Sequence, residues 1–123
     1  MAAIGFDIAA ARFGDGESAF LSARRVADQL GVTLAELAKL IGVARNTLTA
    51  KSSARKVDGA LSNVVRILSM ASEMAGDDNR AVLWFKHQPI PGWGGKTAFD
   101  LVGEGKSGKV LAYLEAVRSG VYA

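Results

Sequence analysis

Apolar residues recur at helical spacing in several separate stretches of the chain. In residues 18–30 and 60–75 the hydrophobic positions fall three or four residues apart, which is the period of an amphipathic helix. Shorter stretches with similar spacing lie at residues 34–41, 45–52, 82–85, 97–102 and 109–118. No segment of useful length alternates apolar and polar residues as a half-buried strand would. The pattern therefore predicts an all-α fold.

Residues at the segment boundaries are of the types that start and stop helices. Thr33 and Glu36 have the three-residue spacing of a capping box, and Gly42 follows as a stop signal. Segment 60–75 is apolar on more than one side, so we expect a central helix that other helices surround. A basic loop over residues 52–58 is predicted to precede this helix.

These patterns divide the chain into three parts. Residues 1–16 show no sustained period and are expected to form a flexible arm. Residues 17–75 are predicted to form a helical unit that includes the long connecting helix. Residues 76–123 are predicted to form a second, smaller helical unit. Within it, a loop that holds both prolines and three glycines separates two predicted helices.

Residues 34–51 have the spacing of a helix-turn-helix. Ala38 is small enough for close contact between two helices, and Gly42 lies four residues later in the turn. Apolar residues that would lock the two helices together are Leu37, Ile41, Val43 and Leu48. Polar and basic residues that can bond to base edges or phosphates follow the turn. We predict DNA contact by Arg45, Asn46, Thr47, Thr49, Lys51 and Arg55.

Two positions depart from the usual helix-turn-helix pattern. Ala44 stands where the second helix usually has a Ser or Asn cap, and Lys51 stands where an apolar residue is usual. Two packed helices that do not contact DNA are therefore the alternative interpretation of this segment.

The distribution of charge favours the DNA-binding interpretation. The net charge is only +3, but residues 23–60 hold seven basic and three acidic side chains, a balance of +4. The balance is −2 in residues 1–22 and +1 in residues 61–123. Such a local excess is typical of a surface that faces phosphates.

The composition excludes several kinds of catalytic and metal site. The chain has no cysteine and a single histidine, so it cannot form a disulfide, a zinc–thiolate site or a multi-histidine metal site. An enzyme would have to use His87, beside which no serine–acid pair is suggested. Gly95-Lys96-Thr97 lacks the glycine that a phosphate-binding loop needs five positions earlier, where Ile90 stands. We therefore predict a protein that is not an enzyme and that binds no cofactor.

The length and the apolar runs predict a small protein without a membrane helix. A chain of 123 residues can bury one core, and its longest apolar runs fall far short of the roughly 20 residues that span a bilayer. The first residues are acidic rather than basic, unlike a signal peptide. We expect a cytoplasmic protein.

The carboxy-terminal half carries an unusual group of aromatic residues and turns. Trp84 is expected in the core, whereas Trp93 in the proline and glycine loop fits the core and an interface equally well. From about residue 18, the chain resembles the Xre-type antitoxins of RES–Xre toxin–antitoxin pairs, also called ParS- or MbcA-like antitoxins. The residues that carry this resemblance are Leu30-Gly31, Glu36-Leu37-Ala38, Ile41-Gly42-Val43, Thr47-Leu48, Ala81, Trp84, Pro89, Gly94-Gly95-Lys96-Thr97, Asp100-Leu101, Gly108, Val110, Leu114 and Gly120-Val121-Tyr122.

The resemblance implies a bacterial protein without catalytic activity that represses its own operon through the helix-turn-helix. Its carboxy-terminal domain would bind a RES-domain toxin, an enzyme that consumes NAD, and cover the active-site pocket of that toxin. The implied toxin contacts are Trp93, Lys96, Arg118, Val121, Tyr122 and Ala123, whereas Trp84, Asp100 and Leu101 would hold the domain together. An aromatic tail with a terminal carboxylate suits a cationic substrate pocket.

Repression through a helix-turn-helix usually reads paired half-sites, so we expect a homodimer on operator DNA. Two other functions fit the same sequence. One is a DNA-binding regulator with a carboxy-terminal dimerisation domain and no toxin partner. The other is an antitoxin that has lost DNA binding.

Overall fold

The protein is helical throughout the residues that the computed structural model describes, which are 16–49 and 54–120. The seven helices of this part of the chain are α2 (Gly16–Leu30), α3 (Leu34–Ile41), α4 (Arg45–Thr49), α5 (Ala54–Ala75), α6 (Asp78–His87), α7 (Ala98–Gly103) and α8 (Ser107–Arg118). The only strand-like pairing within it is an isolated bridge between Pro89 and Thr97. The prediction of an all-α fold is confirmed. Residues 1–15, most of the predicted arm, lie outside the described residues.

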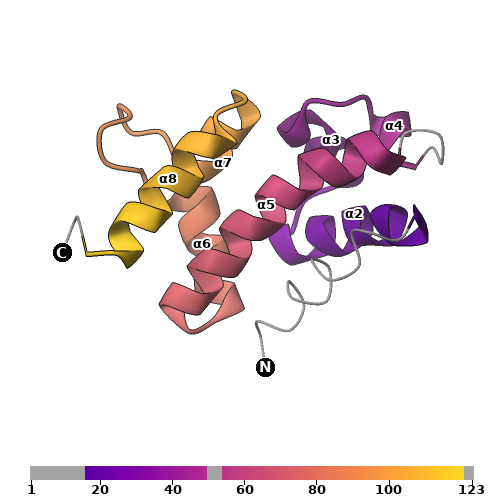
Figure 1. The fold of residues 1–123 in the computed structure, drawn as a ribbon. Helices are drawn as coiled ribbons and strands as arrows, with labels where there is room; N and C mark the ends of the chain where they lie inside the picture. Colours follow the sequence, from indigo (N-terminus) through magenta and orange to yellow (C-terminus); the bar gives the residue numbers. More distant parts are fainter. Residues whose placement is uncertain (1–15, 50–53, 121–123) are drawn as a thin grey trace.

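Helix α5 is the axis of the fold. Figure 1 shows α2, α3 and α4 at one end of the molecule and α6, α7 and α8 at the other, with α5 running through both groups. We call these groups the amino-terminal lobe and the carboxy-terminal lobe. The buried side chains of α5 include Leu61, Val64, Val65, Ile67 and Leu68. Because they point in several directions around the helix, α5 packs on both lobes, as the sequence pattern predicts.

The two lobes share one hydrophobic core. A single cluster of buried side chains draws on all seven described helices. Besides α5, the short helices α3 and α7 join the lobes, and a Cβ added to Gly103 of α7 would lie 3.9 Å from Leu40 Cδ1 of α3. The boundary predicted at residues 75 and 76 falls at the exposed turn between α5 and α6, and the helices on either side of that turn share this core.

Helices α3 and α7 both begin at local sequence signals. The Glu36 N–H donates to Thr33 Oγ1 at 3.0 Å and the Thr33 N–H donates to Glu36 Oε1 at 2.9 Å. At α7 the same reciprocal pair forms between Thr97 and Asp100, at 3.0 and 3.1 Å. These two capping boxes satisfy N–H groups that a helix start would otherwise leave unpaired. The start predicted at Thr33 and the short helix predicted from Thr97 are confirmed.

The predicted starts of α2, α5 and α8 all come too late in the chain, and α2 begins at Gly16, two residues before the predicted start at residue 18. Residues 54–58, predicted as part of a basic loop, form the first turns of α5 rather than a loop. Val57 explains this difference, because it is 1% exposed and extends the apolar face of α5 by one turn before Leu61. Helix α8 also starts at Ser107, two residues before the predicted start at Lys109.

The aromatic core differs from the predicted one. Trp84 is only partly buried, whereas its neighbour Phe85 is fully buried. The ring of Phe85 packs edge-to-face against Phe99, with 5.9 Å between the centroids and 77° between the planes. Trp84 and Trp93 both pack against the core from its edge.

None of the described helices is long and apolar enough to cross a membrane.

Two candidate binding surfaces

The turn between α3 and α4 has the close geometry of a helix-turn-helix. Gly42 adopts a left-handed conformation with φ of 78°, and its N–H donates to the Lys39 carbonyl at 3.2 Å. The Val43 N–H donates to the Ala38 carbonyl at 2.9 Å. This pair of bonds closes α3 with a Schellman motif, which a glycine favours. Ala38 and Leu48 are each 2% exposed, so the buried anchor predicted at Leu48 is confirmed and Ala38 is buried as a contact position between helices would be.

The outer side of α4 carries the polar residues that were expected to face DNA. Arg45 and Asn46 are exposed and Thr47 is partly exposed. The Thr47 N–H donates to the backbone carbonyl of Ala44 at 2.9 Å. Ala44 stands at the usual cap position, so α4 starts without a polar side chain there. Arg55 is exposed as well, but it belongs to the first turn of α5.

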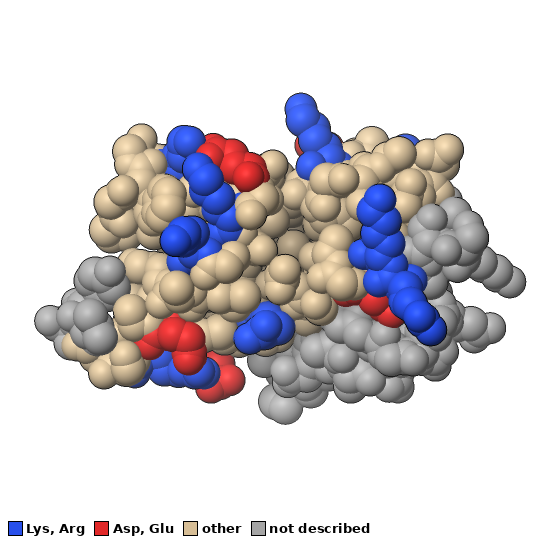
Figure 2. All heavy atoms as spheres, turned by 45° about the horizontal axis from the view of Figure 1, so that its top comes forward, with Lys and Arg blue, Asp and Glu red and all other residues tan. Residues whose placement is uncertain are grey.

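Two other predicted DNA contacts fall outside what the structure describes. The side chain of Thr49 and the whole of Lys51 are in this position. Figure 2 shows Lys and Arg side chains standing out at both ends of the molecule, with fewer Asp and Glu side chains on the same face.

The second surface begins at the loop between α6 and α7. The Ile90 N–H donates to the Lys96 carbonyl at 2.8 Å, and Ile90 itself is 2% exposed, so the loop is closed at its base and anchored in the core. Gly92, Gly94 and Gly95 all have positive φ angles, between 64° and 88°. Residues that carry a side chain rarely adopt such backbone angles, which explains why the loop has glycine at these three positions. Trp93 sits among them and is partly buried.

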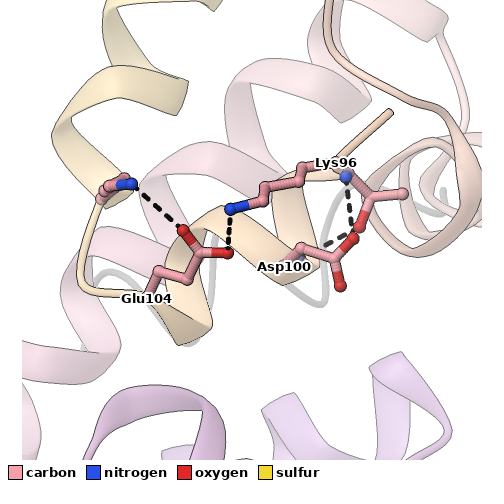
Figure 3. Close-up of polar contacts among 5 residues, drawn as sticks. Lys96, Asp100 and Glu104 are labelled. Carbon is pink, nitrogen blue, oxygen red and sulfur yellow. Dashed lines mark hydrogen bonds and ion pairs between the residues drawn. The ribbon is translucent and has the colours of Figure 1, made fainter. Parts of the chain in front are cut away.

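The end of α7 brings a charged cluster against this loop. The Glu104 carboxylate forms one ion pair with Lys96 Nζ at 2.8 Å and a second with Lys106 Nζ at 3.1 Å (Figure 3). Lys106 Nζ also lies 5.5 Å from the centroid of the Trp93 ring, within the range of a cation–π contact. Hydrogen bonds from Lys96 first and Lys106 second lower the pKa of Glu104, so its carboxylate stays ionised at neutral pH. We call Trp93, Lys96, Glu104 and Lys106 the loop cluster.

The structure thus brings together two of the predicted toxin contacts, Trp93 and Lys96, and adds two residues that sequence reasoning missed. Glu104 and Lys106 flank Gly105, whose φ of 80° ends α7. Glycines just after a short helix, at Gly103, Gly105 and Gly108, are the sequence signal that indicates this turn. Arg118 does not join the cluster. It lies at the other end of α8 and pairs with Glu115.

Val121, Tyr122 and Ala123 lie outside the described residues. His87 is exposed at the end of α6. Asp77 caps α6 by accepting from the Asn79 N–H at 2.7 Å, whereas the buried Asp78 accepts a hydrogen bond from Ser72 Oγ. Within the described ranges, no group of three His, Cys, Asp or Glu side chains could hold a metal ion.

An exposed polar helix after a tight turn, and a separate charged cluster on the carboxy-terminal lobe, define a helix-turn-helix protein with a second helical domain. Comparison with known families makes this specific. Residues 17–64 match the antitoxin Xre-like helix-turn-helix domain, and residues 70–120 match the antitoxin Xre/MbcA/ParS C-terminal toxin-binding domain. The chain therefore belongs to the Xre-type antitoxins, whose second domain implies a toxin partner. Searches of curated proteins and of solved structures found no significant match.

Proposed function

We propose that this antitoxin neutralises a RES-domain toxin that consumes NAD, by covering the active site of that toxin. The observation that carries this proposal is the order of the two matched domains, with the toxin-binding domain over residues 70–120. That domain also favours the proposal over a regulator whose carboxy-terminal half only dimerises. In this proposal the chain acts by binding, without a cofactor or a reaction of its own, in the cytoplasm.

The toxin contacts that we propose lie on the carboxy-terminal lobe. Trp93 and Lys96 come from the loop between α6 and α7, and both are accessible enough to meet a partner. Arg118 and the tail from Val121 to Ala123 extend the contact beyond the end of α8. The tail, which carries the aromatic residue Tyr122, would enter the substrate pocket of the toxin.

We further propose that the amino-terminal lobe represses the antitoxin's own operon as a homodimer on operator DNA. The exposure of Arg45 and Asn46 on α4, after a tight Schellman turn, supports this role. Thr47, Thr49, Lys51 and Arg55 complete the proposed DNA contacts. Arg45 and Arg55 would supply charge for phosphates, whereas Asn46 is of a type that reads base edges.

Co-expression with the RES-domain protein of the neighbouring gene tests the proposed function. We expect the two proteins to co-purify, and we expect the antitoxin to prevent loss of NAD in cells that produce the toxin. The control is the same toxin expressed without the antitoxin, which should deplete NAD. Continued NAD loss in the presence of the full chain, without co-purification, would contradict the proposal.

A further inference from the structure

The end of α7 fixes the position of Lys106 through the backbone. The Gly105 N–H donates to the Val102 carbonyl at 2.9 Å and the Lys106 N–H donates to the Leu101 carbonyl at 2.8 Å. With the left-handed Gly105 between them, these bonds form a Schellman motif. Since Leu101 is fully buried, this motif ties Lys106 to the core. The backbone of Lys106 is therefore held in a fixed position, from which its side chain extends beside the loop.

The side chain of Lys106 is also fixed at its tip. Its ammonium group has Glu104 Oε1 at 3.1 Å on one side and the Trp93 ring at 5.5 Å on the other. Lys96 reaches the other oxygen of the same carboxylate at 2.8 Å (Figure 3). One carboxylate thus holds two ammonium groups close to each other, although like charges repel. This arrangement removes side-chain freedom that a partner would otherwise have to remove on binding.

The charges of the loop cluster do not balance. Two lysines meet one carboxylate, which leaves one positive charge at this point of the surface. Among the described residues, the neighbouring Asp100 forms no ion pair with either lysine: its Oδ2 accepts from the Thr97 N–H at the start of α7, where the helix dipole favours an acid. The side chains of Lys96 and Lys106 remain 45% and 43% exposed, so each ammonium can still donate to an arriving anion.

From this geometry we infer that Lys106 and Lys96, held together by Glu104 over Trp93, form a receptor for a carboxylate on the surface of the toxin. Glu104 and Trp93 act as positioning residues, and the toxin carboxylate supplies the second negative charge. This inference rests on the proposed function and deepens it, because it assigns a new contact residue, Lys106, and an acidic side chain on the partner. It also explains why the loop cluster is organised before the partner arrives.

Binding of the full-length antitoxin to the RES-domain toxin, measured by calorimetry at several salt concentrations, tests the inference. We expect Lys106→Met and Lys96→Met each to weaken binding about tenfold, and Lys106→Glu to weaken it more, since charge pairs at interfaces are worth this much or more. Lys106→Arg keeps the charge and should bind as the wild type does. The double Met variant should lose part of the salt dependence of the affinity.

Arg80→Met is the matched control, because it removes the same charge from an exposed site in the first turn of α6, away from the loop. Thermal unfolding of each variant checks that the fold is intact. Equal toxin affinity of the wild type and both single Met variants overturns the inference. Loss of operator affinity at unchanged toxin affinity also overturns it, because the cluster would then face DNA. A wild-type chain that binds no toxin contradicts the proposed function itself.

Discussion

Lys86 Nζ donates a 2.8 Å hydrogen bond to the carbonyl oxygen of Leu30, across 56 residues of sequence and between the two lobes. Leu30 is the last residue of α2, whose end is closed by bonds from the Gly31 N–H to the Asp28 carbonyl and from the Val32 N–H to the Ala27 carbonyl. Neither bond uses the carbonyl of Leu30. Lys86 thus pairs an acceptor that the local turn leaves open and places a positive charge at the negative end of the helix dipole.

Replacing Lys86 by Met should therefore reduce the stability of the whole protein. Met keeps most of the aliphatic stem but removes the donor, and we expect a loss of about 1–2 kcal/mol in the free energy of unfolding. Urea denaturation measures this loss. Lys109→Met is the control, because Lys109 is exposed on α8 and its replacement should change stability by less than about 0.5 kcal/mol. Equal stability of the two variants would show that the bond to Leu30 contributes nothing.

The shared core predicts that the two lobes unfold in one step. Leu101 of α7 is fully buried, and Leu101→Ala should cost about 2–5 kcal/mol by leaving a cavity. Both tryptophans lie in the carboxy-terminal lobe, so their fluorescence reports on that lobe, whereas far-ultraviolet circular dichroism reports on all helices. Within each protein, we expect the fluorescence and the circular dichroism to change at the same urea concentration, with a lower midpoint for the variant than for the wild type. Two separate transitions would show that the lobes fold independently.

The elements that the sequence predicts best are those whose signals are local. Thr33 with Glu36 predicts the start of α3, and Thr97 with Asp100 predicts a short helix, because each capping box needs only residues three positions apart. The start of α5 was misplaced for the opposite reason. Val57 is isolated among polar residues, and it becomes part of a helix by burial in the core that the lobes share.

The candidate site was predictable only in part, for a similar reason. Trp93 and Lys96 stand out in the sequence beside glycines, and the structure keeps them together. Lys106 joins them only because the turn at Gly105 folds the start of α8 back toward the loop, which no spacing in the sequence indicates. Contacts between residues far apart in sequence depend on packing, and packing is what a single sequence encodes least openly.

The carboxyl group of Glu104 should titrate below the usual range of a glutamate, because Lys96 and Lys106 both stabilise its charged form. A carboxyl with a lowered pKa in the folded state adds stability above its unfolded pKa, and this contribution is lost as the pH falls through the folded pKa. Carbon-detected NMR titration measures the pKa directly. We expect Lys96→Met to raise the pKa of Glu104 more than Lys106→Met does, since Lys96 is the larger cause. No change in either variant would show that the ion pairs do not persist in solution.

Deletion of residues 121–123 tests the proposed role of the tail. If the tail enters the substrate pocket, the shortened chain should still bind the toxin through the loop cluster but should no longer protect NAD. The structure describes α8 up to Arg118 and the turn to Gly120, so the deletion leaves the helix whole. Calorimetry measures binding, and an NAD consumption assay with purified toxin measures inhibition. Full inhibition by the shortened chain would rule out a plugging role.

Arg45→Ala and Arg55→Ala test the proposed DNA surface. Both side chains are exposed, Arg45 at the start of α4 and Arg55 in the first turn of α5, and each should contact a phosphate if the helix-turn-helix binds the operator. Log affinity for DNA falls as log salt rises, because each phosphate contact releases counterions. Each variant should therefore make this negative slope shallower by about one. Fluorescence anisotropy with operator DNA measures the slope, and Arg80→Ala on the other lobe should leave it unchanged. An unchanged slope in both test variants, together with wild-type affinity, would instead favour an antitoxin that no longer binds DNA through α4.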